Sequence, residues 1–235
     1  MKIINIRMLP AALAATLAMV GAALPASAQD VPANNVRLGV YFVFYHANAD
    51  DLAGPYVPAG VNLKVNDVDT LYAAYVRRLS PHFGVELALG SPPVTHTVGK
   101  GPATLGSVPY DGVEISTARW LAPTLLLEYN FFDESARLRP FVGVGVNYTS
   151  FYDRNSTAGG NAASGGPTKI SLSSSIGPAA TAGLSYHINR RWNLHASYSW
   201  SRVNSRLTAD TAGVIRTTHI RFGPQTLVLS AGYSF

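Results

Sequence analysis

The residue types that perform catalysis are present in this chain, but their spacing gives little support to a catalytic or metal site. Its six histidines do not show the spacing of a zinc site such as His-Glu-x-x-His. A nucleophilic triad needs a serine, a histidine and a carboxylate that meet, and His195, Ser197 and Glu128 could be drawn as one. Since the chain has no cysteine, thiolate metal sites and disulfides are excluded.

The composition indicates one β-rich domain. Of the 235 residues, 47% are hydrophobic and 13% are charged, whereas a typical soluble domain carries about 25% charged residues. So apolar a chain is not expected to be disordered. A helical membrane protein needs apolar runs of about 18 residues, and only the N-terminus approaches one. The net charge of +5 is partly due to that segment, so it is poor evidence for nucleic-acid binding.

The N-terminus is predicted to be a secretory signal peptide over residues 1–28, followed by one domain over residues 29–235. Lys2 and Arg7 precede an apolar stretch from Met8 to Leu24, and Ala26-Ser27-Ala28 offers a small-residue cleavage site. A membrane-anchoring helix is the alternative, but no charged stop-transfer flank follows. The protein is therefore expected to be exported.

Beyond residue 28, apolar and small polar residues alternate with a period of two, which is typical of half-buried β-strands. From Leu227 to Phe235, for example, every second residue is apolar or aromatic and those between are mostly small. We predict eight such segments, at 36–47, 68–79, 83–97, 115–131, 138–152, 174–188, 191–204 and 216–235.

The connections between these segments alternate strictly between short and long. The short ones are 80–82, 132–137 and 189–190, and the long ones, rich in Gly, Pro, Asn, Asp and Ser, are 48–67, 98–114, 153–173 and 205–215. Both chain ends fall on the side of the short turns. This rhythm predicts an all-β, eight-stranded antiparallel transmembrane β-barrel with short periplasmic turns and long extracellular loops, since a sheet in a bilayer must close on itself.

A secreted β-sandwich or a lipocalin-like barrel is the soluble alternative. The predicted segments are long for sandwich strands. Aromatic residues also gather at segment ends, as expected of an interfacial girdle: Tyr129, Phe131, Phe141, Tyr186, Trp192, Tyr233 and Phe235. Both features favour the membrane barrel.

The chain resembles the OmpW/AlkL family of outer-membrane proteins over essentially its whole predicted domain. The stretches that carry the resemblance occur in the expected order: Phe83-Gly84-Val85-Glu86-Leu87, Ala122-Pro123-Thr124-Leu125, residues 139–149, Ile188-Asn189-Arg190-Arg191-Trp192 and the ending 230–235. The resemblance implies a barrel in the outer membrane of a Gram-negative-type bacterium that takes up small hydrophobic molecules and releases them sideways into the membrane. The terminal Phe235 resembles the signal for the barrel-assembly machinery.

Strand alternation alone assigns an inward face to each segment. Near the periplasmic end it places a polar plug of Arg37, Arg78, Glu86, Glu128 and His195. Arginine–glutamate pairing there would compensate their desolvation, and an eight-stranded barrel is only just wide enough for its own side chains. We therefore expect a closed periplasmic mouth, with His195, Ser197 and Glu128 in a buried polar network and not in an active site.

Above the plug, the predicted lining of the ligand path is Tyr41, Val43, Tyr45, Tyr72, Val76, Ala88, Leu126, Ser199 and Val228. At positions where the family is expected to place a bulky apolar gate, the chain has Ala88 and Ser199, which implies a wider or wetter interior. Two functions stay open: passive uptake of hydrophobic solutes, or a structural or surface-interaction barrel with a filled lumen. Expected partners are outer-membrane lipid, lipopolysaccharide and small hydrophobic solutes, and no cofactor, metal or nucleic acid is expected.

Overall fold

The computed structural model describes residues 32–235. The predicted signal peptide at 1–28 lies outside the described residues. Within the described part, no helix is long and apolar enough to cross a membrane.

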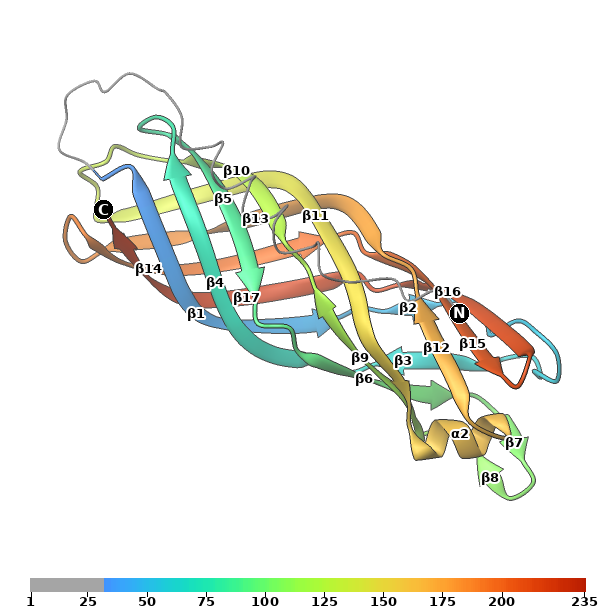
Figure 1. The fold of residues 1–235 in the computed structure, drawn as a ribbon. Coiled ribbons are helices and arrows are strands. Elements are labelled where there is room, and N and C mark those ends of the chain that lie inside the picture. The colour runs from blue at the N-terminus through green and yellow to red at the C-terminus, as the bar shows by residue number, and fades with distance from the viewer. Residues whose placement is uncertain (1–31) are drawn as a thin grey trace, which may run out of the picture. The chain divides into compact units, whose positions relative to one another are not determined.

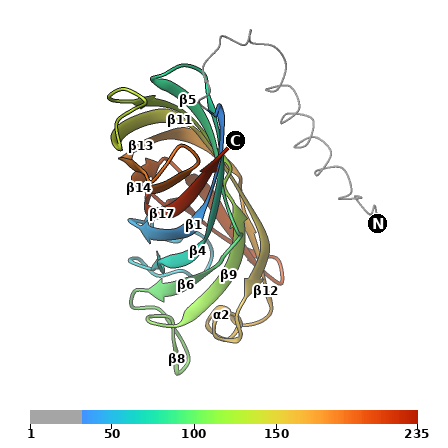
Figure 2. The ribbon, with the colours of Figure 1, turned by 90° about the vertical axis from the view of Figure 1, so that its left-hand side faces the viewer.

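Eight strands form a closed antiparallel barrel, which confirms the predicted fold class (Figure 1). The strands are β1 (Asn34–Tyr45), β4 (Val68–Arg78), β5 (Phe83–Gly90), β10 (Thr124–Asn130), β11 (Leu138–Ser156), β13 (Ser175–His187), β14 (Trp192–Ser201) and β17 (Pro224–Ser234). Each pairs with its neighbour in sequence, and the ring is closed by β1 against β17, where Tyr41 pairs with Val228. Figure 2 shows β1, β17, β14 and β13 side by side along one wall.

The predicted short turns all lie at one end of the barrel, together with the C-terminus (Figure 1). The first and last strands meet there, because Phe235 N donates to the Asn34 carbonyl at 2.9 Å. We call this end the short-turn end. On the outer surface nearby, Tyr129 packs edge-on against Phe131, and Trp192 packs edge-on against Tyr233.

Alternation sorts the side chains of each barrel strand between the lumen and the outside. On β17, Thr226, Val228 and Ser230 are buried, while Leu229 between them is half exposed. The exposed outer side chains form an apolar belt that includes Leu38, Leu71, Leu125, Val144 and Ile176. Phe141, predicted for the aromatic girdle, is instead 1% exposed and faces inward. It shares the parity of Gly143 and Gly145, so strand geometry overrides its residue type.

The four long connections, predicted as loops, are partly folded into strands that extend the barrel wall. This extension contains β2 (Asn48–Ala49), β3 (Asn62–Val65), β6 (Val94–Lys100), β7 (Thr104–Leu105), β8 (Val108–Pro109), β9 (Glu114–Leu121), β12 (Thr168–Leu172), β15 (Asn204–Thr211) and β16 (Val214–Arg221). One wall has the order β3-β6-β9-β11 and the other β12-β15-β16-β2. A short helix, α2 (Ala158–Ser164), is capped by Thr157, whose side chain accepts from Gly160 N.

Three predicted strands are each divided in two. The segment 83–97 becomes β5 and β6, 115–131 becomes β9 and β10, and 216–235 becomes β16 and β17. Pro92 and Pro93 lie in the first division and Pro123 in the second. Proline has no N–H to donate to a ladder, so these residues end regular pairing at the upper edge of the barrel.

Candidate functional site

A buried polar cluster lies across the lumen near the short-turn end. It consists of Arg37 on β1, Glu86 on β5, Glu128 on β10 and His195 on β14, each at most 6% exposed. The Arg37 guanidinium is paired with Glu86, and its Nη1 lies 3.4 Å from Glu128 Oε1 and 3.5 Å from His195 Nε2. Four strands far apart in the sequence thus supply one connected group.

Neighbouring side chains hold this polar cluster in place. The Tyr72 hydroxyl donates to Glu86 Oε1 at 2.8 Å, and Ser185 Oγ lies 3.2 Å from His195 Nδ1. The Phe141 ring stacks on the His195 ring with centroids 4.8 Å apart, and the Arg37 guanidinium lies over the same phenyl ring at 5.9 Å. Strand alternation predicted the position of Tyr72, but its bond to the cluster, and the inward Phe141, were not predicted.

Glycines opposite the charged residues leave the narrow lumen enough room for them. Arg37 pairs across the strands with Gly232, and Glu128 pairs with both Gly84 and Gly143. A Cβ on Gly183 would lie 2.6 Å from the Phe141 ring, so this position has to stay small. In so small a barrel, positions without a side chain make room for the bulky groups of the polar cluster.

Arg78, predicted to belong to the polar plug, forms its ion pair with a residue outside the polar cluster. Its guanidinium forms an ion pair at 2.6 Å with Glu134 from the turn between β10 and β11, and both side chains are partly exposed. Arg139, which was not predicted, is buried in the same region and donates to the carbonyl oxygens of Pro81 and Phe132 at 2.7 and 3.1 Å. Both arginines therefore tie the short turns together below the cluster.

Ser197 is buried on β14, in line with His195, but within residues 32–235 it forms no hydrogen bond with His195 or Glu128. His195 bonds to Ser185 instead, and Glu128 faces Arg37. The three residues from which a triad could be drawn therefore belong to the lumen wall without the hydrogen-bond sequence that a triad requires.

Two small cavities lie above the polar cluster, each of about 30 Å³. Tyr41 and Thr226 border both. The lower cavity is lined by Tyr72, Ala88, Leu126, Ser199 and Val228, among others, and the upper one by Val43, Tyr45, Trp120 and Phe151, among others. The structure thus places every predicted lining residue at a cavity except Val76, which is buried beside Glu86 in the strand register. Ala88 and Ser199 both face the lower cavity.

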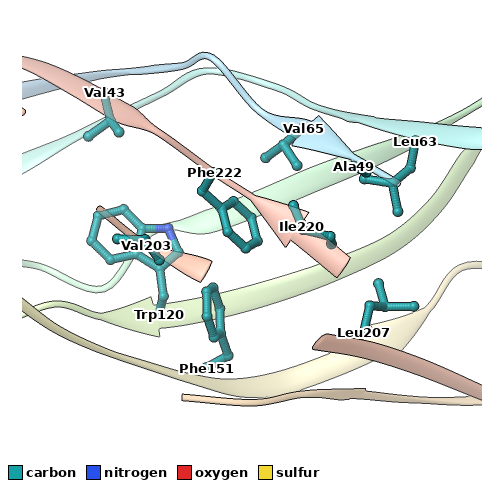
Figure 3. Packing of buried hydrophobic residues seen from close by; sticks show 10 residues of the cluster. All are labelled: Val43, Ala49, Leu63, Val65, Trp120, Phe151, Val203, Leu207, Ile220 and Phe222. Atoms are coloured by element: carbon teal, nitrogen blue, oxygen red, sulfur yellow. The ribbon is translucent and has the colours of Figure 1, made fainter. Parts of the chain in front are cut away.

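An apolar cluster fills the tube at the end opposite the short turns (Figure 3). It consists of Val43, Ala49, Leu63, Val65, Trp120, Phe151, Val203, Leu207, Ile220 and Phe222. The Phe151 and Phe222 rings stack with centroids 5.3 Å apart, and Trp120 Nε1 donates to Thr95 Oγ1 at 2.8 Å. Apart from Val43, these residues were not among the predicted lining. Val203, Ser205, Leu207 and Ala209 stand at every second position of the sequence. This period of two is the signal that could have revealed part of this core.

The barrel wall is interrupted between these two clusters. The pairing of β5 with β10 ends at Ala88–Thr124, and that of β6 with β9 begins at Val94–Arg119. In between, residues 89–93 stand opposite residues 120–123, with an extra residue on one side and three prolines that cannot donate. Ala88 borders the lower cavity and Trp120 the upper one, so the interruption adjoins both.

A closed eight-stranded barrel with an apolar outer belt, aromatic residues at its lower edge and a buried polar cluster inside defines a small outer-membrane β-barrel protein. The family model described as the OmpW family matches residues 35–235, and the chain belongs to this family. It is accordingly a protein of the Gram-negative outer membrane, with the short-turn end toward the periplasm.

Individual relatives agree with this assignment. The chain is 36% identical over 154 residues to Outer membrane protein W of Salmonella typhimurium, which covers 66% of this chain and 67% of the relative. It is 29% identical over 111 residues to Outer membrane protein AlkL of Ectopseudomonas oleovorans, covering 47% and 44% of the two chains. The crystal structure of OprG from Pseudomonas aeruginosa superposes with a TM-score of 0.78 at 20% identity, covering 87% of this chain and 96% of OprG. That likeness shows the fold.

Proposed function

We propose that this protein is a channel for the passive uptake of small hydrophobic molecules, with no catalytic step and no cofactor. A solute would enter from outside through the apolar cluster, reach the lumen, and leave sideways into the membrane. The observation that carries the proposal is the interrupted ladder between β5–β6 and β9–β10, because it adjoins both lumen cavities. Membership of the OmpW family, which contains AlkL-like proteins, supports the same substrate class.

The two ends of the lumen favour this route for physical reasons. An apolar solute gains by leaving water for the apolar cluster, where Trp120, Phe151 and Phe222 would surround it. Passage to the periplasm would require separating Arg37 from Glu86 and Glu128, which leaves buried charges without partners. Movement through the side wall into hydrocarbon carries no such cost. A sideways exit is therefore the favourable path.

Side-chain movement has to accompany transport. Cavities of about 30 Å³ are far smaller than the roughly 300–1,000 Å³ of sites for drug-sized ligands. Tyr41 borders both cavities and its ring lies 5.9 Å from that of Tyr72. Rotation of Tyr41 would join the two spaces, so we propose that this residue divides the lumen.

The small cavities also favour a second candidate function, a structural or surface-interaction barrel of the adhesin or receptor type with a filled lumen. In this alternative the same side chains serve as packing, and the ordered extension from β2 to β16 presents the binding surface. Assembly would be the same in both cases: the exposed Phe235, which directly follows β17, supports recognition by the barrel-assembly machinery.

Uptake of a labelled medium-chain alkane into liposomes that contain the refolded protein tests the first function against the second. We expect saturable, protein-dependent uptake in the wild type and a strong loss in Ala88→Trp, because the added indole fills the lower cavity beside the interruption. Ala182→Trp is the matched control, since Ala182 is exposed on the outer face of β13.

The result is interpreted only for barrels that run as folded species in unheated gels. Equal uptake by wild type and Ala88→Trp would contradict the proposed route. Uptake no greater than in empty liposomes would favour the structural or surface-interaction barrel.

A further inference from the structure

Three exposed arginines lie on the outer surface near the upper end of β13, above the apolar belt. Arg154 lies on β11, Arg202 follows β14 and donates its backbone N–H to the Pro178 carbonyl of β13, and Arg206 lies on β15. Arg154 Nη1 donates to the Leu172 carbonyl at 3.2 Å, and the Arg206 carbonyl accepts from the next residue, Ser173, at 3.1 Å. Two of the three arginines therefore flank the same short segment of chain. We call these three residues the arginine triplet.

The arginine triplet is not neutralised by the protein. None of its members forms an ion pair with a carboxylate of residues 32–235. Other exposed arginines at this end do have such partners: Arg119 pairs with Asp153 at 3.2 Å and Arg221 with Asp50 at 2.7 Å. The hydrogen bond from Arg221 holds the pKa of Asp50 below its usual value.

The height of Arg202, the lowest member of the triplet, matches the headgroup layer of the outer leaflet. On β14, Tyr198 and Trp200 are exposed on the outer face, and Arg202 continues the same alternating row. Ile176, on the adjacent β13, is 75% exposed. Aromatic residues mark the boundary between hydrocarbon and headgroups in such barrels, so the next residues upward meet charged headgroups. Arg154 and Arg206 lie further along the same surface.

The exposed charged residues differ from strand to strand. On the outer end of β4 they are Asp67, just before the strand, and Asp69 within it, while the exposed Lys64 and Lys100 lie on β3 and β6. Guanidinium ions without carboxylate partners are better suited than these lysines to a ligand with fixed phosphates, because guanidinium and phosphate form two parallel hydrogen bonds.

We propose that Arg154, Arg202 and Arg206 form a binding site for the phosphate groups of the outer-leaflet glycolipid, lipid A of lipopolysaccharide. Its acyl chains would pack on Tyr198, Trp200 and Ile176 while its phosphates pair with the triplet. This site lies on the outer wall, outside the lumen, and does not depend on transport. It would keep one glycolipid molecule bound beside β13–β15.

The test measures how much lipid A the refolded full-length protein retains in detergent, by quantitative mass spectrometry after washing. The probes are bisphosphorylated lipid A and its dephosphorylated form. We expect the triple variant Arg154→Gln, Arg202→Gln, Arg206→Gln to retain the bisphosphorylated form roughly a hundredfold less tightly, since each arginine beside an anionic headgroup contributes about fivefold. The wild type should retain the dephosphorylated form weakly.

The matched control removes the same charge at the periplasmic end, in the variant Arg137→Gln, Arg190→Gln, Arg191→Gln, whose three arginines are exposed on short turns. It should bind like the wild type. Folding of each variant is checked by its mobility in unheated gels, and Arg202→Gln alone provides a milder variant. The proposal is overturned if the upper triple variant binds as tightly as the control, or if removing the phosphates leaves wild-type binding unchanged.

Discussion

At the level of single residues, the charge balance of the polar cluster is its most informative property. Arg37 is the only guanidinium in contact with both Glu86 and Glu128 among the described residues, so full ionisation places two negative charges against one positive charge in a buried space. Buried charges are tolerated when paired and are costly when a partner is lost. The arginine and the two glutamates of the cluster should therefore respond very differently to neutral substitutions.

We expect Arg37→Met to destabilise the folded barrel by about 3–5 kcal/mol, because both carboxylates lose their counter-charge. Glu128→Gln should cost less than about 1 kcal/mol, because the amide keeps the shape and removes the surplus negative charge. Urea unfolding in detergent, followed by tryptophan fluorescence, compares the two. Arg190→Met, on an exposed turn, is the control for the loss of an arginine. Equal destabilisation by the first two variants would refute this charge balance.

The sequence was sufficient to bring the members of the polar cluster together, because alternation leaves only two faces for each strand. It could not predict the partner of Arg78, since the ion pair with Glu134 depends on the conformation of a turn. It also misplaced Phe141, whose aromatic character suggested the girdle while its parity required the lumen. Where residue type and strand parity disagree in a narrow barrel, parity is the stronger guide.

At the level of elements, the extension above the barrel was hidden by its composition. Residues 205–215, which include Ser205, Asp210 and Gly213, were predicted to be a loop, yet β15 and β16 pair in register from Asn204–Arg221 to Thr211–Val214. Leu207 is buried in the apolar cluster, so one face of this hairpin packs against that core. The pairing partners of these strands come from distant parts of the chain, such as β12 and β2. Local composition carries no information about them.

The turn of this hairpin supplies a prediction of its own. Ala212 and Gly213 connect the strands with φ values of 50° and 89°, as in a type I′ turn, and alanine is poorly suited to the first position. We expect Ala212→Asn to stabilise the hairpin by about 0.5–1 kcal/mol, because asparagine tolerates this conformation. Hydrogen exchange of amides in β15 and β16 should slow by about two- to fivefold. Ala212→Val should have the opposite effect, and faster exchange in the asparagine variant would contradict the turn assignment.

At the level of the whole molecule, the lumen is closed at both ends, and a different kind of interaction closes each end. The apolar cluster around Trp120 and Phe222 closes the outer end, and the polar cluster around Arg37 closes the periplasmic end. A hydrophobic constriction excludes ions because water leaves it, whereas paired charges block the lumen by filling it. The interrupted wall between β5–β6 and β9–β10 lies between the two closures. This arrangement separates the path of an apolar solute from any path for ions.

Because the closures act in series, opening one of them should leave ion conductance low. We expect no increase in Trp120→Ala, Phe222→Ala, which removes two bulky members of the apolar cluster. A second variant, Arg37→Ala, Glu86→Ala, Glu128→Ala, removes all three buried charges together, so none is left unpaired. It should also stay closed to ions, while the combined variant conducts. Planar-bilayer recordings on folded protein measure this, and conductance in either partial variant would assign the seal to the closure which that variant removes.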